Sequence, residues 1–251
     1  MINLEEPPWW VQLPVLTGQN LELREVDADD VETLFELLTD PKVSRYISPP
    51  PSSARAFAGF IEWAHQQRVA GTCVCFAVVP KGLRQAIGLF QLRALEPTFK
   101  IAEWGFAMGA SFWSTGLFEE AAALVLDFAF RHVGVHRVEA RAVVENGRGN
   151  RALEKLGAKG EAELRRAFKE KDSQFLWAIV SEEWSKPKLV ERTPFDQAKI
   201  RRQIEAALGQ FTAPSAKSSA KLPENRKDAD RFGSRPFPFF LTDSSRDSSE
   251  N

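Results

Sequence analysis

The sequence has little net charge, few cysteines and no long apolar run, and each shortage excludes a class of protein. Its 251 residues carry a formal net charge of -1, so the chain as a whole has no electrostatic preference for nucleic acid. No uninterrupted apolar stretch approaches the roughly 18 residues that span a bilayer. The first residues hold two acids and two prolines, where a secretory signal needs a basic start and an apolar stretch. We therefore expect a cytoplasmic protein whose partners include neither nucleic acid nor membrane.

The two cysteines, Cys73 and Cys75, stand two residues apart in an apolar run. A strand would place both thiols on one face, and two thiols without a nearby histidine make a poor zinc site. We expect both to be reduced, small apolar residues on a strand. We expect no metal site.

Composition divides the chain near Trp184. Residues 1–184 form a continuous series of apolar-periodic segments, whereas Ser, Pro, Lys and Asp dominate the remainder. We expect a first domain over residues 1–184 and a disordered tail over residues 212–251. Between them, residues 185–211 could form a helix, because Thr193 suits an N-cap and Pro194 the first helical position.

Strand and helix patterns alternate within the first domain. Helices are expected after an acidic cap at Asp27 and a serine cap at Ser52 or Ser53. A third helix pattern covers residues 117–132, and Asn146 and Gly157 suit the two ends of a fourth. Strand patterns cover residues 21–26, 73–79, 86–95, 100–108 and 136–144, three of which are consecutive and indicate an antiparallel meander. This order predicts a mixed α/β fold with a central mixed sheet flanked by helices.

A short loop with one glycine, W-S-T-G from Trp113 to Gly116, precedes the strongly apolar helix pattern. A helix N-terminus after a small-residue loop presents unpaired backbone N–H groups and a partial positive charge, which suit a phosphate. A single glycine before a helix is also a common turn. The loop residues alone leave both interpretations open.

Two segments together are more specific. W-S-T-G-L-F-E-E-A, from Trp113, and E-N-G-R-G-N-R-A-L-E-K-L-G-A, from Glu145, resemble the paired motifs of the GNAT acyltransferase superfamily in its RimJ/RimL-like branch. The similarity extends over roughly residues 19–184 in the order of strands and helices. It implies a splayed mixed sheet that holds acetyl-coenzyme A (acetyl-CoA) in the gap between two strands.

The resemblance also implies an activity, namely an N-acetyltransferase that uses acetyl-CoA as cosubstrate. The acceptor would be a primary amine, either a protein N-terminal α-amine or a small amine. A non-catalytic module that binds or senses acyl-CoA is the alternative. The oligomeric state is open, a homodimer included.

The resemblance places the pyrophosphate of acetyl-CoA on the loop of residues 113–118. Of the family's basic-x-x-Gly-x-small pattern, only Gly116 matches strictly, since Trp113 stands at the basic position and Phe118 at the small one. Gly149 stands where many relatives carry a serine thought to protonate the departing thiolate. The cofactor-binding residues that the resemblance implies are Phe106, Ala107, Met108, Ser114, Thr115, Gly116, Leu117, Phe118 and Asn146.

The strand pattern at residues 101–108 contains a lone carboxylate. Alternation places Glu103 on one face with Gly105 and Ala107. In the resembling family, an acidic residue on the corresponding strand receives the proton of the amine, directly or through water. We therefore expect Glu103 to be the catalytic base, and the alternative is a structural glutamate at the surface or paired with a nearby arginine.

Overall fold

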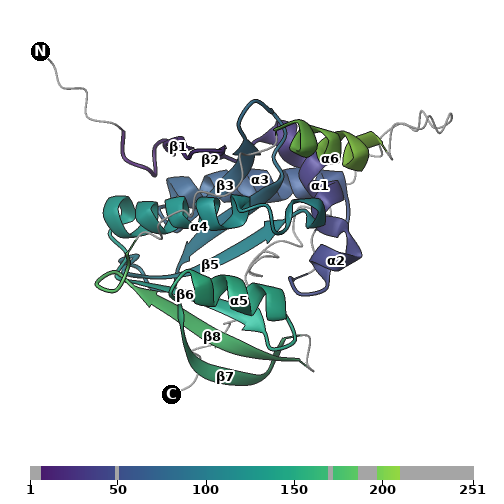
Figure 1. Ribbon diagram of the computed structural model, residues 1–251. Coiled ribbons are helices and arrows are strands. Elements are labelled where there is room, and N and C mark those ends of the chain that lie inside the picture. The colour runs from purple at the N-terminus through teal and green to yellow at the C-terminus, as the bar shows by residue number, and fades with distance from the viewer. Residues whose placement is uncertain (1–6, 49–50, 169–171, 186–196, 210–251) are drawn as a thin grey trace, which may run out of the picture.

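Eight strands form one mixed sheet in the order β1-β2-β3-β4-β5-β6-β8-β7 (Figure 1). The computed structural model describes residues 7–48, 51–168, 172–185 and 197–209. The β5–β6 pair is parallel, and the other neighbouring strands pair antiparallel. The strands are β1 (Leu16–Thr17), β2 (Leu21–Glu25), β3 (Cys73–Pro80), β4 (Gly88–Ala94), β5 (Ile101–Met108), β6 (Arg137–Val143), β7 (Lys159–Phe168) and β8 (Asp172–Val180).

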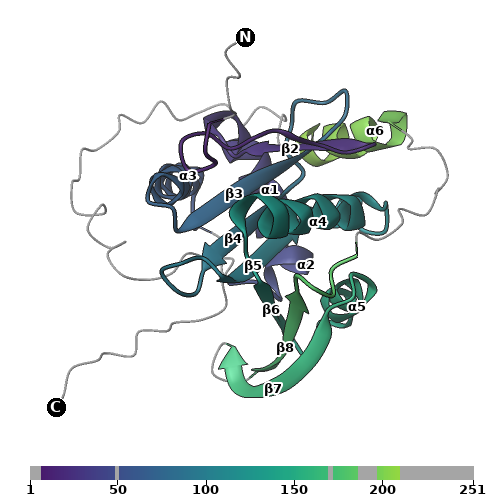
Figure 2. The same cartoon turned by 90° about the vertical axis from the view of Figure 1, so that its left-hand side faces the viewer.

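Helices cover both faces of this sheet. Figure 2 shows α3 and α4 on opposite sides of the strands. Side chains of α1 and α3 pack with Cys75, Ala77 and Val79 of β3, whereas α4 lies on the side of the alternate residues Val74 and Phe76, and its Phe128 ring contacts Phe76. The helices are α1 (Val31–Thr39), α2 (Pro41–Ser44), α3 (Ala54–Val69), α4 (Leu117–Phe128), α5 (Gly147–Lys155) and α6 (Gln197–Gly209).

Local sequence explains where several helices begin and end. The Ser53 hydroxyl accepts the backbone N–H of Ala56 at 3.1 Å and caps α3. The Asn146 side chain accepts the N–H of Gly149 at 3.0 Å and caps α5. Gly157 follows α5 at φ +86°, a left-handed conformation that glycine adopts without strain. The predicted caps at Ser53, Asn146 and Gly157 and the antiparallel meander of β3, β4 and β5 are confirmed.

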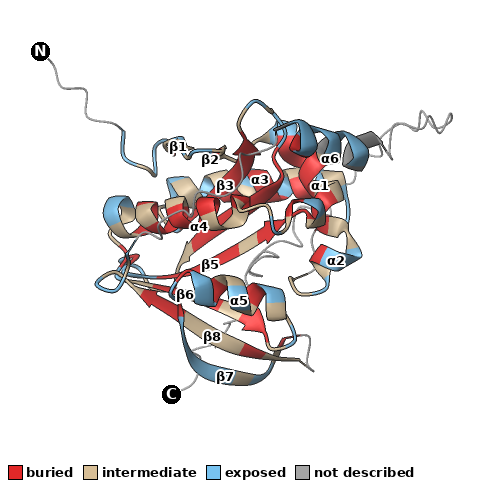
Figure 3. Ribbon diagram, viewed as in Figure 1, coloured by how far each residue is buried: buried red, intermediate tan, exposed pale blue. Residues whose placement is uncertain are grey.

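β3 lies in the centre of the fold, and all eight of its residues are buried. Figure 3 shows how buried residues follow the sheet-facing sides of α1 and α4. Cys73 and Cys75 are both free and buried, and desolvation raises the pKa of the Cys73 thiol to about 12. The prediction of reduced apolar cysteines on a strand is confirmed.

The structure differs from the sequence pattern in one of the long helices. α4 ends at Phe128 and continues as a π-helical turn, Ala129–Val133, instead of running as an α-helix to His132. Gly134 follows the wider turn at φ +80°. His132 stacks on Phe128 with 5.7 Å between ring centroids, which the wider turn accommodates. The apolar pattern therefore located the helix but not the change of its pitch.

The interval of residues 185–211 contains α6. Its residue Ile200 is only 3% exposed and belongs to the main core cluster, so this helix packs on the domain that precedes it. Thr193 and Pro194, the expected cap residues, lie outside the described residues, as does the expected tail of residues 212–251. Across the described ranges, no helix is long and apolar enough to cross a bilayer.

Candidate functional site

Strands β5 and β6 separate along their length. Their parallel pairing covers Ile101↔Arg137, Ala102↔Val138 and Glu103↔Glu139. Beyond Glu103 both strands continue, β5 to Met108 and β6 to Val143, without pairing to each other in the described sheet. Figure 1 shows the two arrows diverging below α4. The separation leaves one edge of the second half of β5 without a strand partner.

The β4–β5 ladder decides which backbone groups face that separation. The N–H of Gly109 donates to the carbonyl of Ile87 at 2.9 Å. Because hydrogen-bonding direction alternates along an antiparallel strand, the backbone groups of Ala107 also point toward β4. Those of Phe106 and Met108 point toward β6. Of the three residues expected to bind a cofactor here, Phe106 and Met108 thus offer backbone groups to the separation, and Ala107 does not.

The carbonyl of Met108 already has a partner. It accepts the indole Nε1–H of Trp113 at 2.9 Å. This bond ties the start of the loop to the end of β5. The Met108 N–H and both backbone groups of Phe106 remain directed at the separating strand.

The loop of residues 113–118 lies at this end of β5. Gly116 precedes α4 at φ +89° as its N-cap residue, and the helix has no side-chain cap. Within the described ranges, the backbone N–H groups of Ser114, Thr115, Gly116 and Phe118 have no hydrogen-bond acceptor. Open backbone donors at the N-terminus of a twelve-residue helix fit an anion such as a phosphate.

Phe118 occupies the small position of the loop pattern without filling the loop. Its ring packs against Phe106, with centroids 4.7 Å apart, and stacks on Phe90 at 5.6 Å. The side chain is therefore part of the core beneath α4. The large residue at this position is compatible with the open backbone donors beside it.

Asn146 and Gly149 are sterically coupled at the start of α5. A Cβ atom added to Gly149 would lie 2.6 Å from the Asn146 Nδ2 atom, which is closer than real contacts allow. The capping geometry of Asn146 thus disfavours a serine at position 149. A serine at position 149 would therefore require the Asn146 side chain to shift.

Glu103 lies on β5 where the separation begins, and its side chain is 3% exposed. The Arg93 Nη2 atom of β4 lies 2.6 Å from one carboxylate oxygen, and the Arg141 Nε atom of β6 lies 3.7 Å from the other. The structure therefore contains the arginine partners of the alternative interpretation. The role of Glu103 as the base stays a prediction.

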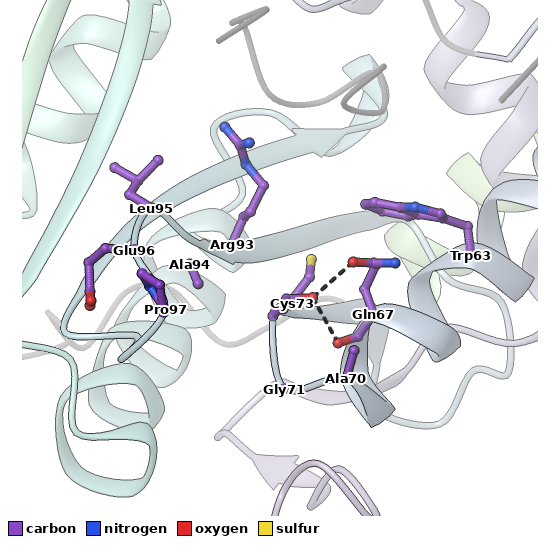
Figure 4. A pocket seen from close by; sticks show the side chains of 11 residues that line it. Trp63, Gln67, Ala70, Gly71, Cys73, Arg93, Ala94, Leu95, Glu96 and Pro97 are labelled. Carbon is purple, nitrogen blue, oxygen red and sulfur yellow. Dashed lines mark hydrogen bonds between the residues drawn. The ribbon is translucent and has the colours of Figure 1, made fainter. Parts of the chain in front are cut away.

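A pocket opens on the face of the sheet that α3 covers, which is also the face of the Glu103 side chain. It lies near the start of β5, at the end of this strand opposite to the loop. It has a volume of about 340 Å³. Figure 4 shows Arg93 of β4 and Trp63 of α3 on two sides of it, with Cys73 and Gln67 between them. Since Arg93 also contacts Glu103, the carboxylate lies between this pocket and the separated strands.

Glu96 lines the same pocket, but the hydrogen bonds of its carboxylate lie within the β4–β5 turn. Its carboxylate accepts the backbone N–H and the hydroxyl of Thr98 and the backbone N–H groups of Lys100 and Ile101. The hydrogen bonds from Thr98 make the largest contribution to lowering the Glu96 pKa, to about 2. Glu96 is therefore a poor base near neutral pH. Among the described residues, no three His, Cys, Asp or Glu side chains cluster closely enough to hold a metal ion.

This chain is similar in sequence to N-acetyltransferases of Bacillus species. An uncharacterized N-acetyltransferase, p20, of Bacillus licheniformis is 26% identical over 157 residues, covering 61% of this chain and 86% of the relative. A second, YnaD of Bacillus subtilis, is 24% identical over 178 residues, covering 68% and 99%.

Solved structures share the fold. The RimL acetyltransferase of ribosomal protein L7/L12 superposes with a TM-score of 0.61 at 17% identity, covering 66% of this chain and 94% of RimL. RimJ of Mycobacterium smegmatis, solved in complex with CoA-disulfide, superposes with a TM-score of 0.59 at 18% identity, covering 78% and 91%. The acetyltransferase (GNAT) domain family matches residues 20–159. The chain thus belongs to the GNAT acetyltransferase family, and it is an N-acetyltransferase with a RimJ/RimL-like fold.

Proposed function

We propose that this protein transfers the acetyl group of acetyl-CoA to the α-amine of a protein N-terminus, in the cytoplasm. One observation carries the proposal. Beyond Glu103, β5 separates from β6 and leads to a loop whose open backbone donors begin at Ser114. This arrangement offers an edge of backbone groups for an extended thioester carrier and a donor cluster for its phosphates.

The residues for acetyl-CoA follow from the direction of their backbone groups. Phe106 and the N–H of Met108 would bind the pantetheine portion along the free edge of β5. The N–H groups of residues 114–116 and 118 would bind the pyrophosphate. The RimJ structure with a CoA compound supports the use of this class of cosubstrate.

The acceptor would bind in the pocket beside Arg93, on the other side of Glu103. An amine must be neutral to attack the thioester, and the arginines around Glu103 disfavour a cationic amine. An α-amine with a pKa near 7.7 to 8.0 costs about 1 kcal/mol to deprotonate at pH 7, whereas a lysine near 10.4 costs about 4.6 kcal/mol. The name of the RimL relative, an α-N-protein acetyltransferase, supports the same acceptor class.

Glu103 would receive the proton of the attacking amine, with Arg93 and Arg141 holding its carboxylate in place. Gly149 supplies no acid for the departing thiolate. A thiol with a pKa of about 8.5 leaves as thiolate at pH 7 at a cost of roughly 2 kcal/mol, so an acid is useful but dispensable. Most of the rate enhancement would come from holding the amine close to the thioester carbonyl carbon in the orientation for attack.

The test is transfer from acetyl-CoA to a panel of acceptors, followed by thiol release and by mass spectrometry. The panel contains peptides with a free α-amine, the same peptides with a blocked α-amine and one free lysine, and small primary amines. We expect acetylation at the free α-amine and little at lysine. Acetylation of small amines alone would contradict the acceptor class. Tight binding of acetyl-CoA without transfer to any acceptor would favour the sensor alternative.

A further inference from the structure

The loop at residues 113–118 contains no cation of its own. Trp113 stands at its first position, and the first turn of α4 adds two carboxylates, Glu119 and Glu120. Carboxylates at this end of a helix complement the partial positive charge that would otherwise attract an anion. Backbone donors alone would therefore have to hold a doubly charged pyrophosphate next to acidic residues.

Arg148 of α5 reaches this loop from the other side of the separated strands. Its guanidinium carbon lies 4.6 Å from the centroid of the Trp113 ring, a cation–π geometry. Its Nη1 atom lies 3.3 Å from the hydroxyl oxygen of Ser114. The tryptophan at the basic position of the loop thus serves as a platform for an arginine from another element.

The guanidinium of Arg148 has donors to spare. Arginine carries five N–H groups, and Arg148 directs one nitrogen at Ser114. Other arginines of the described chain, such as Arg93 and Arg137, are paired with carboxylates, but no carboxylate of the described ranges forms an ion pair with Arg148. Stacking on an aromatic ring orients a guanidinium without using its N–H groups.

We propose that Arg148 is the cation that binds the pyrophosphate of acetyl-CoA, in place of the basic residue that the loop lacks. The inference rests on the proposed use of acetyl-CoA and adds a residue from outside the loop. Arg148 would close over a pyrophosphate bound to the N–H groups of residues 114–116 and 118. Because it joins α5 to the loop, it would also link the two separated strands when the cosubstrate binds.

The experiment measures the Kd of CoA by titration calorimetry for the wild-type chain and for Arg148→Ala, Arg148→Lys and Arg165→Ala. Arg165 is an exposed arginine of β7, so its variant controls for the loss of one positive charge. Loss of a hydrogen bond to a charged group is expected to weaken CoA binding about 10- to 100-fold in Arg148→Ala. Arg148→Lys should lose less, since it keeps the charge without the planar donors. Melting temperatures without ligand should differ by only a few degrees, because the side chain is exposed and loses only its contacts with Trp113 and Ser114.

Two further measurements make the assignment specific. The same loss is expected with 3′-dephospho-CoA, which retains the pyrophosphate. Added KCl should weaken CoA binding more in the wild type than in Arg148→Ala, because salt screens the attraction between the guanidinium and the pyrophosphate. A loss that disappears with 3′-dephospho-CoA would overturn the assignment to the pyrophosphate. Equal CoA affinity in the wild type and Arg148→Ala would overturn the role of Arg148 but leave the proposed function standing. A wild-type chain that does not bind CoA at all would refute the proposed function, and this inference with it.

Discussion

The substitution Glu103→Gln tests whether the Glu103 carboxylate has a catalytic role or only a structural one. The side chain of Glu103 is 3% exposed between Arg93 and Arg141, whose side chains are 19% and 20% exposed. Removing one partner of a buried ion pair costs about 3 to 5 kcal/mol. Glutamine keeps the size and one acceptor, and the arginines retain some solvent, so we expect a loss of about 2 to 3 kcal/mol in the free energy of unfolding. Turnover should fall about 10²- to 10⁴-fold if the carboxylate is the base, with CoA affinity unchanged.

The double variant Glu103→Gln, Arg93→Gln makes the two roles distinguishable. It removes the unpaired charge of Arg93, so a large part of the lost stability should return. Turnover should stay low, because no carboxylate has been restored. The assays are urea unfolding for stability and thiol release from acetyl-CoA for turnover. Wild-type turnover in either variant would refute the reasoning and leave Glu103 a structural residue.

Three further predictions concern the loop, the cysteines and the C-terminal region. Gly116→Pro should abolish the stabilisation by CoA, which is about 2.7 kcal/mol at 100 times the Kd. The reason is that proline removes an N–H group and cannot adopt φ +89°. A shift in melting temperature that survives in this variant would place the pyrophosphate elsewhere. Cys73 and Cys75 should resist a thiol reagent at pH 8 until urea is added. Because burial raises the Cys73 pKa from 9.0 to about 12, the unfolded thiol loses its proton first, and stability should fall as pH rises above 9; rapid labelling of the folded chain would contradict this. Truncation after Gln210 should shift the melting temperature by no more than about a degree. Truncation after residue 185 exposes the core around Ile200 and should lower the free energy of unfolding by about 1.5 to 3 kcal/mol. Equal melting temperatures of the two truncated chains would show that α6 adds no stability.

Local patterns in the sequence determined the helices α1, α3, α4 and α5 and the strands β2 to β6, in their order. The caps Ser53 and Asn146 each satisfy a backbone N–H within three residues, and the turn at Gly157 depends on one φ angle. Such features depend on neighbouring residues, so a single sequence shows them. The short α2 and the two-residue β1 lacked enough residues for a periodic signal.

The surroundings of the candidate site were decided by tertiary structure. Glu103 was visible as a lone carboxylate, but its partners Arg93 and Arg141 come from two other strands, which only the sheet order β4-β5-β6 brings together. The direction of the backbone groups of Met108 depends on the register with β4. The sequence likewise showed a tryptophan where a basic residue was expected, and only the packing of α5 beside the loop places Arg148 over its ring. Alternation and capping act over a few residues, whereas the charges and donors of this site come from segments that meet only when the whole sheet is assembled.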